Sequence, residues 1–184
     1  MQLNLVPHPE TPPTEPFKLW VNVEHSGAFG ATATTNMWFC MGAPASRFVL
    51  PEHAEKPVRT EELWESTCFE AFLRAKDGGD PYREWNFAPS GNWAAYDFAS
   101  HREGRADADV SPPYVRIEDN LTWWAVGATI AVPAKARWDL GLSAILEEQD
   151  GTKSYWAIAH PPGDKPDFHD PACFALELPA ASEA

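Results

Sequence analysis

The chain has 184 residues and carries 14 Lys and Arg side chains against 27 Asp and Glu, a formal net charge of −13 at pH 7. Single all-β domains commonly run to about 200 residues, so this length favours one domain with one core. The negative charge disfavours binding to nucleic acid backbones and to anionic lipid surfaces. Residues 1–16 lack the basic start and apolar run of a signal peptide, and no segment has the roughly 20 apolar residues of a membrane span. We therefore expect a soluble, cytoplasmic protein.

Prolines cluster near both ends of the chain and in several loops. Because proline lacks a backbone N–H donor and fixes its own φ angle, these clusters mark the places where regular strands stop. The clusters predict a proline-rich N-terminal arm at residues 1–16, a folded domain at residues 17–178 and a C-terminal tail at residues 179–184.

Between the proline clusters, alternating residue types predict about nine or ten β-strands. Asp150-Gly151 favours a tight hairpin turn, because such turns need positive backbone angles. No window of helix length shows apolar residues every three or four positions. The pattern predicts an all-β fold, a β-sandwich of two antiparallel sheets. The clearest predicted strands cover residues 17–24, 34–41, 63–73, 83–88, 93–98, 121–132, 140–146, 154–159 and 174–178.

The three cysteines, Cys40, Cys68 and Cys173, form an odd set without Cys-x-x-Cys spacing. This pattern argues against both a disulfide framework and a structural zinc site. We expect small buried thiols instead.

The segment from residue 59 to residue 98 is the most informative part of the chain. Side chains on a strand alternate between the two faces of a sheet, so each strand here has an apolar set and a mixed set. The apolar set is expected in the core and comprises Phe69, Leu73, Trp85, Phe87, Tyr96 and Phe98. The mixed set is expected together on the outer face and comprises Trp64, Glu70, Asn86, Trp93 and Asp97.

This mixed face has the residue types of a sugar-binding surface. Flat aromatic rings stack on a pyranose, while carboxylates and amides hydrogen-bond its hydroxyls. Arg102 could reach over the mouth of the face and bind an acidic substituent with its planar guanidinium. For Arg59 the favoured interpretation is a surface ion pair. The plainer alternative for the whole face is an ordinary solvated side of an antiparallel sheet.

Three segments carry a family resemblance: LWESTCFEAFL, NFAPSGNWAAYDF and SYWAIAHPPGDKPDFH. In order and spacing they resemble the DOMON-like superfamily over residues 17–178, and most closely an uncharacterised bacterial branch of it. The superfamily includes haem-binding cytochrome domains and family-nine carbohydrate-binding modules. The resemblance implies a jelly-roll-type sandwich with a pocket toward one end that holds haem or a saccharide, without deciding between them.

Neither haem nor a metal has a clear ligand pattern in the chain. Met37 and Met41 alternate with residues typical of a core, and no Cys-x-x-Cys-His motif is present. His160, Asp167 and His169 lie in one proline-bounded loop and are the candidates for a divalent metal, although turn and carbonyl hydrogen bonds are the favoured explanation for them. No cofactor is therefore expected, with haem and a divalent metal as alternatives.

The sequence favours a non-catalytic module that binds a carbohydrate or a related small molecule through Trp64, Glu70, Asn86, Trp93, Asp97 and Arg102. Glu70 could converge with Glu84 or Asp97 in a glycoside hydrolase, but no residue pattern marks a carboxyl with a raised pKa. A protein-interaction module that uses exposed tryptophans, including a homodimer, is the competing class. A haem-binding domain is the third.

Overall fold

The computed structural model describes residues 1–27 and 29–181. In this part of the chain twelve β-strands are joined by loops and by three short 3-10 helices. The strands are β1 (Gln2–Pro7), β2 (Leu19–His25), β3 (Thr32–Met41), β4 (Cys68–Ala75), β5 (Tyr82–Phe87), β6 (Trp93–Phe98), β7 (Ala106–Asp107), β8 (Tyr114–Asp119), β9 (Trp124–Pro133), β10 (Trp138–Glu147), β11 (Lys153–Ala157) and β12 (Leu176–Leu178). The 3-10 helices are η1 (Ala45–Arg47), η2 (Leu63–Glu65) and η3 (Pro171–Cys173).

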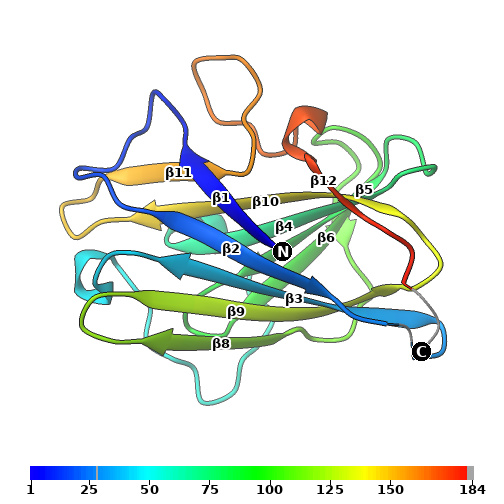
Figure 1. The fold of residues 1–184 in the computed structure, drawn as a ribbon, viewed down its shortest axis with the longest axis horizontal. Helices are drawn as coiled ribbons and strands as arrows, with labels where there is room; N and C mark the ends of the chain where they lie inside the picture. The colour runs from blue at the N-terminus through cyan, green and yellow to red at the C-terminus, as the bar shows by residue number, and fades with distance from the viewer. Residues whose placement is uncertain (28, 182–184) are drawn as a thin grey trace.

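The strands pair along one path in the order β7-β6-β5-β4-β10-β11-β1-β2-β3-β9-β8, with β12 added beside β10. All pairs between these strands are antiparallel, and the path curls so that its two halves face each other (Figure 1). Strand β1 joins the halves, because its first residues pair with β2 and its last two pair with β11. The all-β antiparallel prediction is confirmed. The predicted division into two separate sheets is not, since the strands form one continuous, strongly curled sheet.

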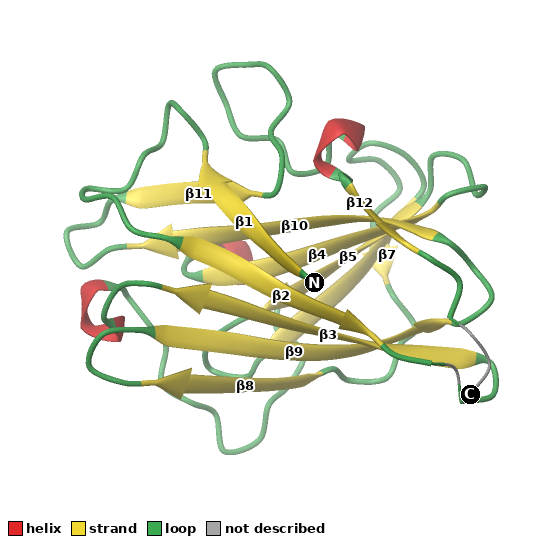
Figure 2. Cartoon of the chain, in the orientation of Figure 1, coloured by secondary structure: helices red, strands yellow, loops and turns green. Residues whose placement is uncertain are grey.

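The main core fills the space between the two halves (Figure 2). Phe39 of β3 lies 5.1 Å, centroid to centroid, from Phe69 of β4, and Trp124 of β9 lies 5.8 Å from the same ring. All three side chains are buried. Inward residues recur at every second position, as the sequence alternation predicted, because successive side chains point to opposite faces of a strand.

The sheet begins inside the segment that the sequence predicted as an arm. Gln2–Pro7 forms β1, and Leu5 is buried in the core. The prolines that follow had predicted an arm outside the folded domain. Residues 114–119 also form a strand that the alternation did not reveal, because β8 is an edge strand with mostly exposed side chains. Of the predicted tail, residues 182–184 lie outside the described part of the chain.

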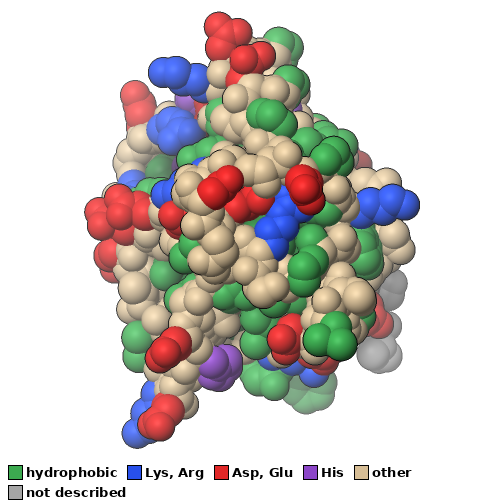
Figure 3. All heavy atoms as spheres, turned by 90° about the vertical axis from the view of Figure 1, so that its left-hand side faces the viewer, with side chains coloured by type: hydrophobic (Ala, Val, Ile, Leu, Met, Phe, Trp, Pro, Cys, Tyr) green, Lys and Arg blue, Asp and Glu red, His purple; other side chains and the backbone are tan. Residues whose placement is uncertain are grey.

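Two local predictions are met by the described residues. Gly151 has φ of +87° in the β10–β11 turn, a conformation that glycine adopts without strain. The three cysteines are free thiols, with Cys68 and Cys173 buried and Cys40 half-buried. No helix in residues 1–27 or 29–181 has the length and apolar character to cross a membrane. At the end of the molecule drawn in Figure 3, acidic and basic side chains intermingle over apolar and uncharged surface.

Candidate ligand-binding site

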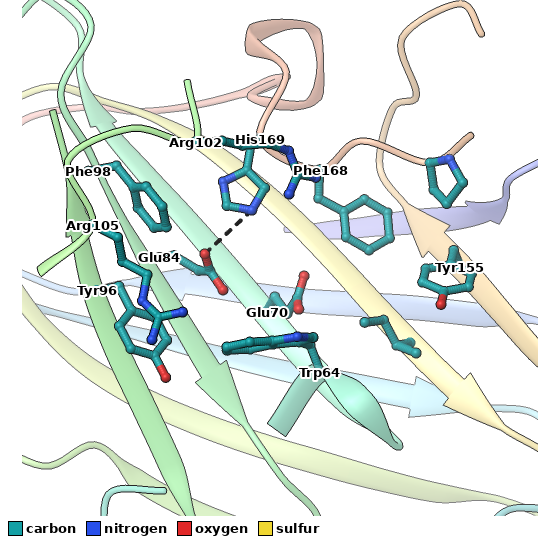
Figure 4. A pocket seen from close by; sticks show the side chains of 12 residues that line it. Trp64, Glu70, Glu84, Tyr96, Phe98, Arg102, Arg105, Tyr155, Phe168 and His169 are labelled. Atoms are coloured by element: carbon teal, nitrogen blue, oxygen red, sulfur yellow. Dashed lines mark ion pairs between the residues drawn. The ribbon is translucent and has the colours of Figure 1, made fainter. Parts of the chain in front are cut away.

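A second buried region lies on the opposite face of β4, β5, β6, β10 and β11, away from the main core. Apolar side chains of these strands pack there against the segment between β11 and β12, as Phe72 does against Phe174 at 6.0 Å. The segment does not cover the whole face. A cavity of about 370 Å³ remains between the strands, η2 and this segment (Figure 4). This volume lies within the range of small-molecule sites.

Two glutamates form the floor of this cavity. Glu70 on β4 pairs in register with Asn86 on β5, and Phe72 pairs with Glu84, so Glu70 and Glu84 are diagonal neighbours on one face. Both side chains line the cavity and both residues are buried, with 3% and 5% of their surface exposed. Figure 4 shows the two carboxyl groups projecting from adjacent strands into the same space.

Each carboxyl group is held by one neutral partner. Ser143 of β10 donates its hydroxyl hydrogen to Glu70 Oε2 at 2.9 Å, and Asn86 donates from Nδ2 to Glu84 Oε1 at 2.6 Å. Among the described residues, no hydrogen bond reaches Glu70 Oε1. Glu84 Oε2 lies 3.6 Å from His169 Nε2, which is too far for a hydrogen bond. One oxygen of each group is therefore fixed, and the other is available to a ligand.

The two carboxyl groups hold protons at higher pH than ordinary glutamates. Burial, together with the neighbouring Glu84 carboxyl, raises the pKa of Glu70 to about 8. Burial also raises the pKa of Glu84, although the Asn86 amide and the two nearby arginines, Arg105 and Arg102, oppose this shift. Two close carboxyl groups in a low-dielectric site cannot both ionise cheaply, so at neutral pH Glu70 retains a proton that an ordinary glutamate would lose.

A hydrogen-bond chain sets the orientation of His169 beside Glu84. The Arg102 backbone N–H donates to Tyr82 Oη at 3.1 Å, and Tyr82 Oη lies 2.7 Å from His169 Nδ1. Burial lowers the pKa of His169 to about 4, so the ring is neutral at pH 7. The other ring nitrogen, Nε2, faces Glu84 Oε2 at 3.6 Å, beyond hydrogen-bond distance.

Aromatic rings form the walls of the cavity. Trp64 of η2 meets Tyr96 of β6 edge to face at a centroid distance of 6.0 Å, and Tyr155 of β11 lies 6.2 Å from Phe168. Tyr96 is 1% exposed, and its hydroxyl has no hydrogen-bond partner among the residues that the structure describes. Burial, together with the nearby Glu61 carboxylate, raises the pKa of Tyr96, although the two groups do not meet hydrogen-bond geometry.

Two arginines at the cavity already have carboxylate partners. Arg102 donates from Nη2 and Nε to Asp167 Oδ1 at 2.8 and 3.1 Å, and Arg105 Nη2 lies 2.6 Å from Glu61 Oε2. The predicted location of Arg102 at the mouth of the site is met. Its guanidinium, however, is paired with Asp167 of the segment between β11 and β12, residues 158–175, which we call the covering segment. The sequence did not reveal this pairing.

Glu70 and Asn86 lie on the predicted face, and Asn86 is fully buried and donates to Glu84. Trp64 lines the cavity, but from the 3-10 helix η2 and not from the strand that the sequence predicted over residues 63–73. The placement of Trp93 and Asp97 on that face is wrong. In the β5–β6 hairpin Asn86 pairs with Ala94 and Glu84 pairs with Tyr96. Residues directly opposite each other share a face, so Tyr96 and Phe98 line the cavity, and Trp93 and Asp97 point to the other side.

Trp93 belongs to the main core, where Arg59 lies over its ring at 4.7 Å. Arg59 Nη1 lies 3.9 Å from Asp107 Oδ1, the surface ion pair that was expected, and Arg59 also donates hydrogen bonds to the carbonyl oxygens of Ala95 and Ala108. Asp97 pairs with Arg83 at 2.6 Å and lines a separate cavity of about 280 Å³. Its predicted contact with the ligand of the first cavity therefore has no geometric support.

The three candidate metal ligands do not converge. His160 Nε2 contacts the carbonyl oxygen of Val6, Asp167 binds Arg102 and His101, and His169 lies over Glu84. Within the described residues no three His, Cys, Asp or Glu side chains are grouped as metal ligands. The covering segment, with Phe168 and His169, and the wall residues Tyr155 and Arg105 were missed as parts of this site, because only tertiary packing brings them to the strands.

No protein-family model matches the chain, and no curated protein sequence matches it. Among solved structures, the chain is similar to a putative carbohydrate-binding protein from Bacteroides uniformis ATCC 8492. The TM-score is 0.59 at 15% sequence identity, and the match covers 95% of this chain and 83% of the other. At this identity the likeness is one of fold.

Proposed function

We propose that the protein binds a small carbohydrate-like molecule, without catalysis, in the cavity above Glu70 and Glu84. The observation that carries this proposal is the pair of buried carboxyl groups, each with one oxygen that has no hydrogen bond within the described residues. Figure 4 shows both carboxyl groups facing the cavity, where a ligand can reach these oxygens. A ligand with several hydroxyl or amine donors would supply the missing hydrogen bonds.

The walls of the cavity support the same ligand class. Trp64 and Tyr155 offer ring surfaces for the apolar side of a sugar, while the floor is polar. We interpret the two facing halves of the curled sheet as the layers of a DOMON-like jelly-roll sandwich, with the ligand on the outer side of one layer. The fold likeness to a putative carbohydrate-binding protein is consistent with this proposal.

Titration of the purified protein with a saccharide panel, followed by tryptophan fluorescence and calorimetry, tests the proposal. Removal of the Trp64 ring should weaken binding of the responding saccharide about 10-fold, since stacking on one aromatic ring contributes about 0.5–1.5 kcal/mol beyond the buried area. The matched control is Trp123→Ala, because Trp123 is 37% exposed beside β9 in the other half of the sheet. Absence of binding by every saccharide, or equal affinity of Trp64→Ala and wild type, would refute the proposal.

A further inference from the structure

We infer that the ligand carries a protonated amine, as an amino sugar does, and that its ammonium group binds between Glu70 and Glu84. This inference rests on the proposed function of the cavity and narrows its ligand class. A neutral sugar does not explain why two buried acids lie side by side while neither forms an ion pair with a lysine or arginine of the described residues.

The charge inventory around the cavity leaves a place for one cation. Within the described residues, neither Glu70 nor Glu84 has an ion pair with lysine or arginine. Of the two nearest guanidinium groups, that of Arg102 pairs with Asp167 and that of Arg105 pairs with Glu61. Arg102 and Arg105 act on Glu84 only from a distance, so within the described residues the two carboxyl groups of the floor have no lysine or arginine in direct contact. Buried charges in proteins are ordinarily paired.

The remaining groups that face the carboxyl pair do not supply a cation. Ser143 from β10 and Asn86 from β5 are neutral donors, and Cys68 on β4 remains a thiol because burial raises its pKa well above the ordinary value. His169 from the covering segment is neutral at pH 7, since burial lowers its pKa to about 4. Tyr82 and Tyr96 are neutral phenols for the same reason, as burial raises the pKa of each.

An ammonium group matches the open acceptors better than a hydroxyl group. Glu70 Oε1 and Glu84 Oε2 are the two carboxyl oxygens without a hydrogen bond among the described residues, and they belong to diagonal neighbours on one sheet face. An ammonium group has three N–H donors and a full positive charge, whereas a hydroxyl has one donor. Hydrogen bonds between ionised partners are about twice as strong as neutral ones.

The walls of the cavity already hold a cation against aromatic rings. The Arg105 guanidinium carbon lies 4.4 Å from the Tyr96 ring centroid and 5.5 Å from that of Trp64. Both rings line the cavity that contains Glu70 and Glu84. Aromatic faces combined with carboxylates are a usual environment for ligand ammonium groups.

Binding of the amine should release a proton to the solvent. Before binding, the Glu70 carboxyl holds a proton at pH 7, because its pKa is raised to about 8. The ammonium group retains its own three hydrogens and brings one positive charge beside this carboxyl, which favours the ionised form of the carboxyl. The Glu70 proton therefore passes to the solvent, and the carboxylate left behind pairs with the ammonium group.

Two matched pairs of compounds test the inference: glucosamine against glucose, and benzylamine against benzyl alcohol, each titrated by calorimetry at pH 7. We expect the amine to bind at least 10-fold more tightly than its neutral partner in at least one pair. N-acetylglucosamine, in which the nitrogen is uncharged, should behave like glucose. Titrations in two buffers of different ionisation enthalpy should show release of about one proton per amine bound, or less where the pair is partly ionised.

Glu70→Gln and Glu84→Gln should each abolish the preference for the amine. Glu118→Gln on the exposed edge strand β8 changes the net charge equally and should preserve it. Saccharide binding without an amine preference would overturn the inference and leave the proposed function standing. Amine binding without any saccharide binding would support the inference and refute the carbohydrate class. Binding by none of the five compounds would overturn both.

Discussion

The molecule buries two glutamates, Glu148 and Glu70, to the same extent but shifts their pKa values in opposite directions. Glu148, at the end of β10, is 3% exposed, as is Glu70 in the cavity. Arg47 binds the Glu148 carboxylate through Nε at 2.7 Å and Nη2 at 3.1 Å, and the Thr14 backbone N–H donates at 2.9 Å. Burial alone would raise the pKa of Glu148, but these hydrogen bonds outweigh it and the pKa is lowered.

The difference shows that a partner, rather than burial, separates a structural acid from a binding one. Glu148 and Arg47 tie the proline-rich segment to η1, since Arg47 also donates to the Glu15 carbonyl oxygen. The chain itself thus supplies every hydrogen bond that this carboxylate needs. At Glu70 and Glu84 the chain supplies one neutral donor to each group and leaves the rest to a ligand.

The largest effect is expected from breaking the structural pair. Arg47→Met leaves the buried Glu148 carboxylate without its cation and should lower the free energy of unfolding by about 3 kcal/mol. Urea unfolding measures this loss. Arg137→Met serves as the control, because the Arg137–Asp77 pair is exposed and contributes less than about 1 kcal/mol. Equal losses for the two variants would show that Glu148 does not depend on its cation.

The cavity acids should destabilise the free protein as the pH rises. A carboxyl group whose pKa is raised on folding stabilises the folded state at low pH, and this stabilisation is lost as the pH climbs from the unfolded value toward the folded one. For Glu70 the window runs from about 4.5 to about 8. His169, with its lowered pKa, acts in the opposite direction, but only below the ordinary histidine pKa of 6.5.

Between pH 6.5 and 8 the wild type should therefore lose about 1–2 kcal/mol of unfolding free energy. Glu70→Gln should flatten this slope, because glutamine cannot ionise. Glu148→Gln should leave the slope unchanged, since the lowered pKa of Glu148 acts at acid pH. Urea titrations at several pH values measure these slopes, and a wild-type slope that persists in Glu70→Gln would contradict the assignment.

The smallest expected effects come from removing one hydroxyl group near Glu148 and one in the cavity. Thr14 donates its side-chain hydrogen to Glu148, so Thr14→Val should lower the free energy of unfolding by about 1–2 kcal/mol. The Tyr96 hydroxyl has no hydrogen-bond partner among the described residues, so Tyr96→Phe should change the stability of the free protein by less than about 0.5 kcal/mol. Thermal unfolding of both variants measures the comparison. A destabilised Tyr96→Phe would reveal a partner that the structure lacks.

Alternation of residue types was sufficient to predict an all-β fold and most of its strands, because the period of a strand is local information. It also separated the two side-chain sets of β4 and β5 correctly. Trp93 was assigned to the wrong set at the β5–β6 turn. Aromatic residues lie on both faces of β6, so the pattern alone does not specify which β6 side chains share a face with Asn86 of β5. Only the register, with Asn86 opposite Ala94, decides it.

The rest of the site depends on contacts across long stretches of chain. His169 approaches Glu84, and Asp167 neutralises Arg102, through packing of the covering segment on the strands. No local pattern encodes that packing. The raised pKa of Glu70 results first from burial and then from the neighbouring Glu84 carboxyl, so the carboxyl of an ordinary-looking strand residue becomes unusual only in the folded protein.

NMR titration of the glutamate carboxyl carbons, in protein labelled with ¹³C at that position, is the direct test of the raised Glu70 pKa. One glutamate signal of the ligand-free protein should titrate near pH 8, it should disappear in Glu70→Gln, and an added amine should move its titration to lower pH. If every glutamate signal titrates near the ordinary value of 4.5, Glu70 does not hold a proton in the cavity at pH 7, and the proposed amine site between the two carboxyl groups is wrong.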